Sequence, residues 1–112
     1  MARFPNERGK VLVAKNSPLP QGSVEAIPYE FEFKGVTTAT HVSTKVYDED
    51  GRDVTADVTT GSPSASGNVV TIKKLENLKP GQVYRIVLVA TIDTTQTREA
   101  VGDVIAVDPR KV

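Results

Sequence analysis

Residues that could carry chemistry are few in this 112-residue chain, and their spacing forms no catalytic set. His41 is the only histidine and there is no cysteine, which excludes a histidine-based metal cluster, a Ser-His-Asp triad and a thiol nucleophile built from this chain alone. The pattern around His41 predicts a solvent-facing strand residue. Glu30 and Glu32 alternate with aromatic residues and are expected in water, without the apolar surroundings that raise the pKa of a catalytic carboxyl group. The sequence therefore predicts a protein that is not an enzyme and uses no cofactor.

An acidic cluster around Gly51 invites a calcium interpretation. Its members are Asp48, Glu49, Asp50, Asp53 and Asp57. Aligning Gly51 with the glycine of an EF-hand loop puts Val46 at the first liganding position, and an apolar first ligand excludes that motif. An exposed turn built from Asp and Gly is favoured. The sequence leaves open whether the hairpin at 48–57 holds a cation in a looser site.

The overall charge gives no case for an anionic partner, because 14 basic residues balance 14 acidic ones. Glycines are scattered rather than gathered into a phosphate-binding loop, and no basic patch is interleaved with aromatic residues. No run approaches the roughly 20 apolar residues that a spanning helix needs. We therefore expect a soluble chain, made in the cytoplasm, whose partners include no nucleic acid, no membrane and no small-molecule substrate.

Residues 1–23 are rich in proline and glycine, with only the run VLVA at 11–14 resembling a strand. This composition predicts an extended N-terminal arm, followed by a packed domain over 24–112. The arm carries Arg3, Arg8 and Lys10 against a single acid, Glu7. It is either a frayed terminus or an extended segment that lies on a neighbouring molecule.

The rest of the chain follows the period of two that is typical of strands. In IPYEFEFK the rings of Tyr29, Phe31 and Phe33 fall on one face, which must be core. Further strands are expected at about 41–48, 52–59, 69–75, 84–93 and 98–107, with a polar loop at 61–68. β-branched residues dominate and no window has helical periodicity. The rhythm predicts an all-β antiparallel sandwich of about seven strands.

The stretch LENLKPGQVYRIVLVA, residues 75–90, predicts a tyrosine corner. Leu78, Pro80, Gly81 and Tyr84 have the spacing for a crossover between sheets, in which the tyrosine hydroxyl bonds a backbone group a few residues upstream. This stretch resembles the turn into the penultimate strand of fibronectin type III domains and related immunoglobulin-like folds. The resemblance implies an immunoglobulin-like or fibronectin type III-like sandwich.

A wider resemblance covers about residues 37–107. The successive blocks are VYDEDGRDVT, GSPSASGN, VVTIKKLENLKPGQVYRIVLVATI and REAVGDVIAV. Their order resembles the small immunoglobulin-like virion proteins of tailed bacteriophages. The resemblance implies a non-enzymatic structural protein of the virion, docking at the neck, the tail or its fibre attachment as an adaptor, or decorating the capsid. It also implies that the partners are other virion proteins in a symmetric, multi-copy assembly.

The outward half of the long strand is the candidate partner-binding surface. If Tyr84 and its alternate neighbours face the core, then Arg85, Val87 and Val89 face the other way, and valines on a wet face are unusual. Either these are scattered exposed valines, or the arm or a neighbouring subunit covers the face. Covering is favoured, so Arg85, Val87 and Val89, together with Arg3, Arg8 and Lys10 of the arm, are the predicted partner-binding residues.

The alternative function is a carbohydrate-binding or adhesion module of a cell-surface protein. Such modules usually present exposed aromatic rings. Every other ring here is assigned to core or arm, which leaves Tyr47 alone as a poor platform.

Overall fold

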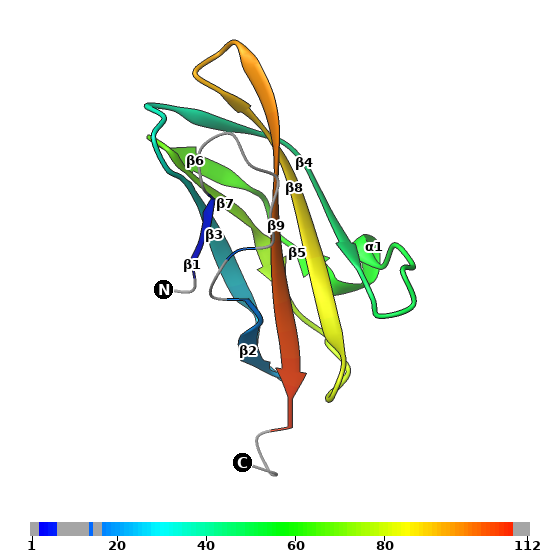
Figure 1. The fold of residues 1–112 in the computed structure, drawn as a ribbon. Coiled ribbons are helices and arrows are strands. Elements are labelled where there is room, and N and C mark those ends of the chain that lie inside the picture. Colours follow the sequence, from blue (N-terminus) through cyan, green and yellow to red (C-terminus); the bar gives the residue numbers. More distant parts are fainter. Residues whose placement is uncertain (1–2, 7–13, 15–16, 109–112) are drawn as a thin grey trace.

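The computed structural model describes residues 3–6, 14 and 17–108, which form two β-sheets packed face to face (Figure 1). One sheet, the β3 sheet, contains β1 (Arg3–Asn6), β3 (Ile27–Phe33), β7 (Val69–Leu75) and β5 (Thr59–Thr60) in that order, with β6 (Ser64–Ser66) also paired to β7. The other, the β8 sheet, contains β2 (Leu19–Gly22), β9 (Gln96–Val107), β8 (Val83–Ile92) and β4 (Ala39–Tyr47). The predicted all-β sandwich is confirmed at this level.

The core lies between the sheets and follows the alternation that the sequence predicts. Tyr29, Phe31 and Phe33 of β3 are buried, and so are the five alternate residues of β8, namely Tyr84, Ile86, Leu88, Ala90 and Ile92. Val70 and Ile72 of β7 and Val104 of β9 are buried in the same core. Because side chains on a strand point alternately to its two faces, this register fixes which residues of β8 and β9 face outward.

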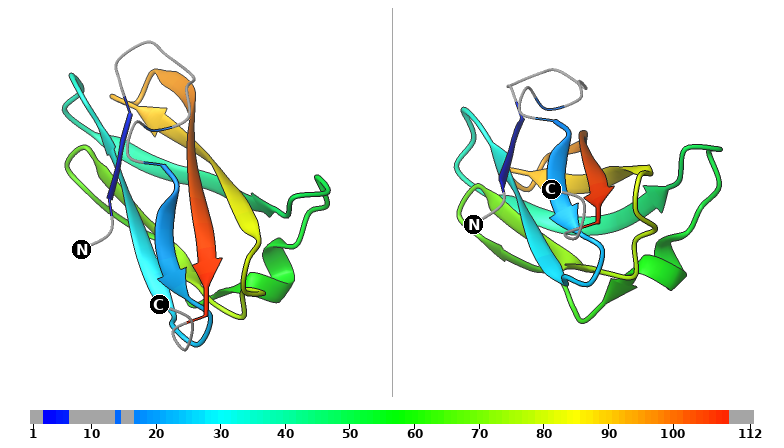
Figure 2. Two further views of the ribbon diagram at one scale, coloured as in Figure 1. Left: turned by 60° about the horizontal axis from the view of Figure 1, so that its bottom comes forward. Right: turned by 90° about the horizontal axis from the view of Figure 1, so that it is seen from below.

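The described part of the predicted arm forms edge strands of both sheets, which the sequence did not predict. β1 pairs in parallel with β3, and β2 pairs in parallel with β9 at the edge of the other sheet. Phe4 is fully buried, with its ring centroid 5.5 Å from that of Tyr29 and 5.1 Å from that of Phe31. The views in Figure 2 show β2 running beside β9. Local composition could not reveal these contacts, because each one joins residues that are distant in the sequence.

A buried polar network fastens β2 to the other sheet. Gln21 is 1% exposed, and its side-chain amide donates hydrogen bonds to the backbone carbonyls of Leu75 at 2.7 Å and Glu25 at 2.9 Å. The Tyr29 hydroxyl donates to the Gln21 side-chain oxygen at 2.9 Å. Burial raises the pKa of Tyr29 far above its usual range, so this hydroxyl keeps its proton. A buried amide is stable only when it is bonded in this way.

The segment after β4 differs from the predicted second strand of a hairpin. Only Asp53 keeps an antiparallel bridge, to Tyr47, and α1 (Thr55–Val58) follows as one helical turn. The Asp53 carboxylate accepts hydrogen bonds from the Thr55 backbone N–H at 3.0 Å and hydroxyl at 2.6 Å. An Asp side chain that bonds the backbone two residues on favours a turn over a strand, and the spacing of Val54 and Val58 also suits a helix.

The crossover before β8 has the geometry of a tyrosine corner. The Tyr84 hydroxyl accepts a hydrogen bond from the Lys79 backbone N–H at 2.9 Å, and Leu78 and Tyr84 are both buried. Between them, Pro80 precedes Gly81, whose φ of 87° lies in the left-handed region that favours glycine. This corner sets where β8 begins, and therefore which of its residues face outward.

Candidate docking face

The outward face of the β8 sheet, which we call the docking face, is built from matched rows of β4, β8 and β9. Cross-strand partners lie side by side on one face of a sheet, so the pairing register defines these rows. They read Tyr47–Arg85–Asp103, Lys45–Val87–Val101 and Ser43–Val89–Glu99 across the three strands, with Val83–Ile105 beyond the first of them. In Figure 1 the three strands lie side by side.

The centre of the docking face is apolar. Val83, Val87 and Val89 of β8 keep part of their surface exposed, as do Val101 and Ile105 of β9. Val87, Val89 and Val101 are direct neighbours, and the Arg85–Asp103 row separates them from the Val83–Ile105 pair. Aliphatic side chains gathered in this way on two paired strands, rather than scattered singly, mark a candidate interaction site. β1 and β2 join sheet edges, so these described parts of the predicted arm do not lie across the face.

One ion pair crosses the apolar centre. The Arg85 guanidinium donates two hydrogen bonds to the Asp103 carboxylate, at 2.9 and 3.0 Å. The hydrogen bond to Asp103 raises the pKa of Arg85, with a smaller contribution from the negative charge itself. The pair neutralises both charges where they lie, so the face can meet an apolar surface without an isolated charge at its middle.

A pocket of about 410 Å³ adjoins one end of the docking face. Its lining comes from the end of β4, the loop at 48–51 and the outward side chains of β8 and β9, namely Tyr47, Asp48, Glu49, Gly51, Val83, Arg85 and Asp103. The Glu49 carboxylate accepts a hydrogen bond from the Val83 backbone N–H at 2.7 Å, which ties the loop to the strand. Tyr47 is the single aromatic residue outside the buried core, since Phe4, Tyr29, Phe31, Phe33 and Tyr84 are all buried.

The predicted partner-binding residues do not gather at one place. Arg85, Val87 and Val89 share the docking face, whereas Arg3 lies on the outward face of the β3 sheet, where it donates to the Glu30 carboxylate at 2.7 and 2.9 Å. The hydrogen bond and charge of Glu30 raise the pKa of Arg3. Arg8 and Lys10 lie outside the described residues. Arg3 and Arg85 therefore point away from opposite sides of the sandwich.

The Asp48 carboxylate of the acidic loop is bonded within the loop. The Asp48 side chain accepts hydrogen bonds from the backbone N–H groups of Asp50 at 2.9 Å and Arg52 at 3.0 Å, and the Arg52 guanidinium lies 3.2 Å away. The hydrogen bond from the Arg52 backbone is the main cause that lowers the pKa of Asp48. Within the described residues no group of three or more potential ligands is placed to hold a metal ion.

His41 is not the solvent-facing residue that the sequence predicts. The register shifts between His41 and Ser43, so Val42 takes the exposed position, with 54% of its surface accessible, and His41 is half-buried. His41 lines a pocket of about 250 Å³ with Thr44, Thr55 and Lys73, and its Nε2 shares a hydrogen bond with the Thr44 hydroxyl at 2.7 Å. Burial lowers the pKa of His41, and the charge of Lys73 lowers it further.

Sequence reasoning missed two contributors to the docking face. Val101 and Ile105 alternate with Ala100, Gly102, Val104 and Ala106, which are the buried positions of β9. The alternation itself was a sufficient signal that Val101 and Ile105 face outward. That they lie beside Val87 and Val83 required the pairing of β8 with β9, which only the structure gives.

Comparison with the known protein families, with curated proteins and with solved structures finds no match to this chain. The fold and the docking face therefore define it as an all-β, two-sheet sandwich with an apolar outward surface. Among the described residues, no helix is long and apolar enough to cross a membrane.

Proposed function

We propose that this chain is a non-enzymatic structural protein of a tailed-bacteriophage virion, with an immunoglobulin-like sandwich that is assembled in several copies through its docking face. Its location would be the mature particle, as an adaptor at the neck, tail or fibre attachment or as a decoration of the capsid. The order of the sequence blocks over residues 37–107 suggests the virion role, and the tyrosine corner at Tyr84 is a feature of immunoglobulin-like sandwiches.

The aliphatic side chains gathered at the centre of the docking face are the observation that carries the proposal. An adaptor or decoration protein acts by burying a surface against its neighbours, and closed symmetric assemblies reuse one patch in every copy. The described strands of the arm, β1 and β2, join sheet edges and leave this patch partly exposed, so a partner can cover it. Arg85 and Asp103 neutralise each other within the patch, which suits burial on assembly.

The test is incorporation of the tagged chain into particles produced from its own gene cluster. The double substitution Val87→Lys and Val89→Lys should leave the far-ultraviolet circular dichroism and the unfolding transition intact, because both side chains lie outside the core. It should remove the chain from density-banded particles. Val24→Lys is the matched control, since Val24 is 87% exposed and lies outside the docking face. Absence of the wild-type chain from the particles, or unchanged incorporation of the double variant, would contradict the proposal.

A carbohydrate-binding module is the second candidate, because Tyr47 and the polar groups of the 410 Å³ pocket could hold a sugar. Aromatic stacking together with carboxylate and guanidinium hydrogen bonds is a common way to bind hydroxyl-rich ligands. A single ring makes a small platform, which is why this function ranks second. A glycan-array signal that disappears in Tyr47→Ala and persists in Val24→Lys would favour it over the virion role.

A further inference from the structure

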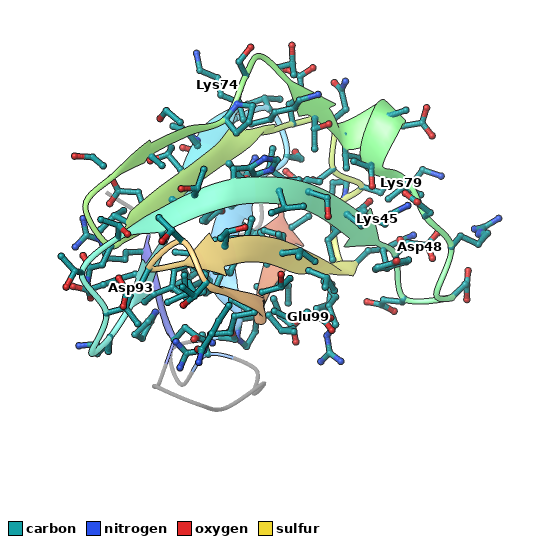
Figure 3. The ribbon with its side chains drawn as sticks, turned by 90° about the horizontal axis from the view of Figure 1, so that it is seen from above. Lys45, Asp48, Lys74, Lys79, Asp93 and Glu99 are labelled. Carbon is teal, nitrogen blue, oxygen red and sulfur yellow. The ribbon has the colours of Figure 1, made fainter. Side chains whose placement is uncertain are left out.

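The docking face has different polar groups on the two sides of its apolar centre. β4 contributes the Ser43 hydroxyl, the Tyr47 phenol and the Lys45 ammonium, which also forms a single exposed contact of 3.4 Å with the Asp53 carboxylate. β9 contributes the carboxylates of Glu99 and Asp103. β8 lies between them and presents mainly valine. In Figure 3 Lys45 and Glu99 belong to the two strands that flank β8.

This arrangement is complementary to itself under one particular rotation. Two sheets packed face to face keep their strand directions within about 30° of each other and lie about 10 Å apart. A two-fold axis parallel to the strands and above β8 would place β4 of each copy over β9 of the other. The β4 side chains would then face the β9 carboxylates on both sides. The valines of the two copies would meet in the middle, and so would the two Arg85 side chains, each of them bonded to its own Asp103.

A two-fold axis across the strands gives the opposite result. It would place β4 over β4 and β9 over β9, so that Lys45 would approach the other copy's Lys45 and the carboxylates would approach each other. Like charges held face to face are destabilising. The axis along β8 brings the two Arg85 side chains together, but each is neutralised by two hydrogen bonds to Asp103, whereas Lys45 has only a single 3.4 Å contact with Asp53. Charge complementarity therefore favours the axis along β8. The chain has 14 basic and 14 acidic residues, so no net repulsion opposes the approach of two copies.

We propose that the docking face binds a second copy of this chain across a two-fold axis along β8, with β4 of each copy lying over β9 of the other. The inference rests on the proposed function because it uses the same face. It identifies the molecule bound there as a second copy of this chain. Lys45 lies one row from both Glu99 and Asp103 of the other copy, within reach of its long side chain. The dimer would then be the unit that enters the particle.

The first experiment measures the mass of the purified chain by sedimentation equilibrium over a concentration series. The wild type should show twice the monomer mass at high concentration. Val87→Lys should stay monomeric, because it places a charge at the centre of the interface. Lys45→Glu and Glu99→Lys should each weaken self-association about tenfold, since each turns two exposed attractions into repulsions. Lys34→Glu, in the turn that follows β3 and with its side chain 51% exposed, is the matched control and should associate as the wild type does.

Mixing the two charge-reversed chains gives the sharper result. In a pair made of one Lys45→Glu chain and one Glu99→Lys chain, glutamate meets lysine at both contacts. The mixture should therefore dimerise as tightly as the wild type, while each variant alone stays weak. A wild type that is monomeric at every concentration, or a mixture no tighter than its components, would overturn the inference.

The outcomes separate this inference from the proposed function. A monomeric wild type whose incorporation into particles still depends on Val87 and Val89 refutes the dimer and leaves the virion role standing. A dimer with the charge-swap behaviour that is absent from particles refutes the virion role and supports the dimer.

Discussion

Gly102→Ala should destabilise the fold, because Gly102 lies against the ring of Phe4. A Cβ built on Gly102 would lie 2.7 Å from Cγ and Cδ2 of Phe4 and 2.8 Å from Cδ1. Carbon atoms in contact normally stand about 3.5–4.0 Å apart, so one of the two must move by about 1 Å. Phe4 is fully buried between Tyr29 and Phe31 and has little room to yield. Overpacking of this kind costs about 1–3 kcal/mol of the free energy of unfolding.

The assay is urea unfolding followed by circular dichroism, arranged as a double-mutant cycle with Phe4→Ala. Phe4→Ala alone should cost about 3–5 kcal/mol because it leaves a cavity. In that background the clash is absent, and Gly102→Ala should be neutral or stabilising by about 0.5–1 kcal/mol, since alanine loses less backbone freedom than glycine in a strand. A cost of Gly102→Ala that is the same with and without Phe4 would show that β1 does not pack on β9.

Three further predictions concern the buried amide, the hairpin tip and the acidic loop. Gln21→Ala should cost about 1–3 kcal/mol in the same unfolding assay, because it removes the acceptor of the buried Tyr29 hydroxyl and a hydrogen bond to the Leu75 carbonyl, while Gln96→Ala, exposed at the start of β9, should cost little. Thr94→Gly should stabilise by about 0.5–1 kcal/mol, because Thr94 has φ of 65° in the turn between β8 and β9, and no gain in the urea midpoint would argue against strain there. Folding lowers the pKa of Asp48 below its usual value of 3.8, so the contribution of Asp48 to stability is present above that pH and is lost as the pH falls through the folded pKa. The free energy of unfolding should therefore decline less steeply with falling pH in Asp48→Asn than in the wild type. An equal decline in the two proteins would contradict this role.

The sequence predicts the strands that have strict alternation and misses elements that depend on distant partners. β3 and β8 show their buried residues at every second position, so their burial could be predicted directly. β1 and β2 are four residues each and carry prolines. Phe4 is buried because Gly102 leaves space for its ring. Gln21 is buried because its side chain forms hydrogen bonds with Tyr29 and Leu75. None of these pairings has a local signal, although a glycine within a strand often marks a close approach.

Only part of the docking face could be predicted from the sequence, because the rest depends on pairing between distant strands. Alternation along β8 places Arg85, Val87 and Val89 outward, but the patch is completed by Val101 and Ile105, and its charge pattern by Lys45 and Glu99. These residues come together only through the antiparallel register of three strands. In β4 the alternation was also misleading, since a shift in register between His41 and Ser43 moves Val42 to the outside.

The orientation of two copies at the docking face can be measured directly with a spin label. The chain has no cysteine, so Thr95→Cys, in the exposed turn between β8 and β9, gives a single labelling site. An axis along β8 places the two turns at the same end of the dimer, and two sheets about 10 Å apart predict a label separation of roughly 15–30 Å by pulsed electron paramagnetic resonance. A separation near the 44 Å length of the molecule would place the turns at opposite ends and contradict the pairing of β4 with β9. The absence of any dipolar interaction between labels, even at the highest concentration of the sedimentation series, would contradict self-association itself.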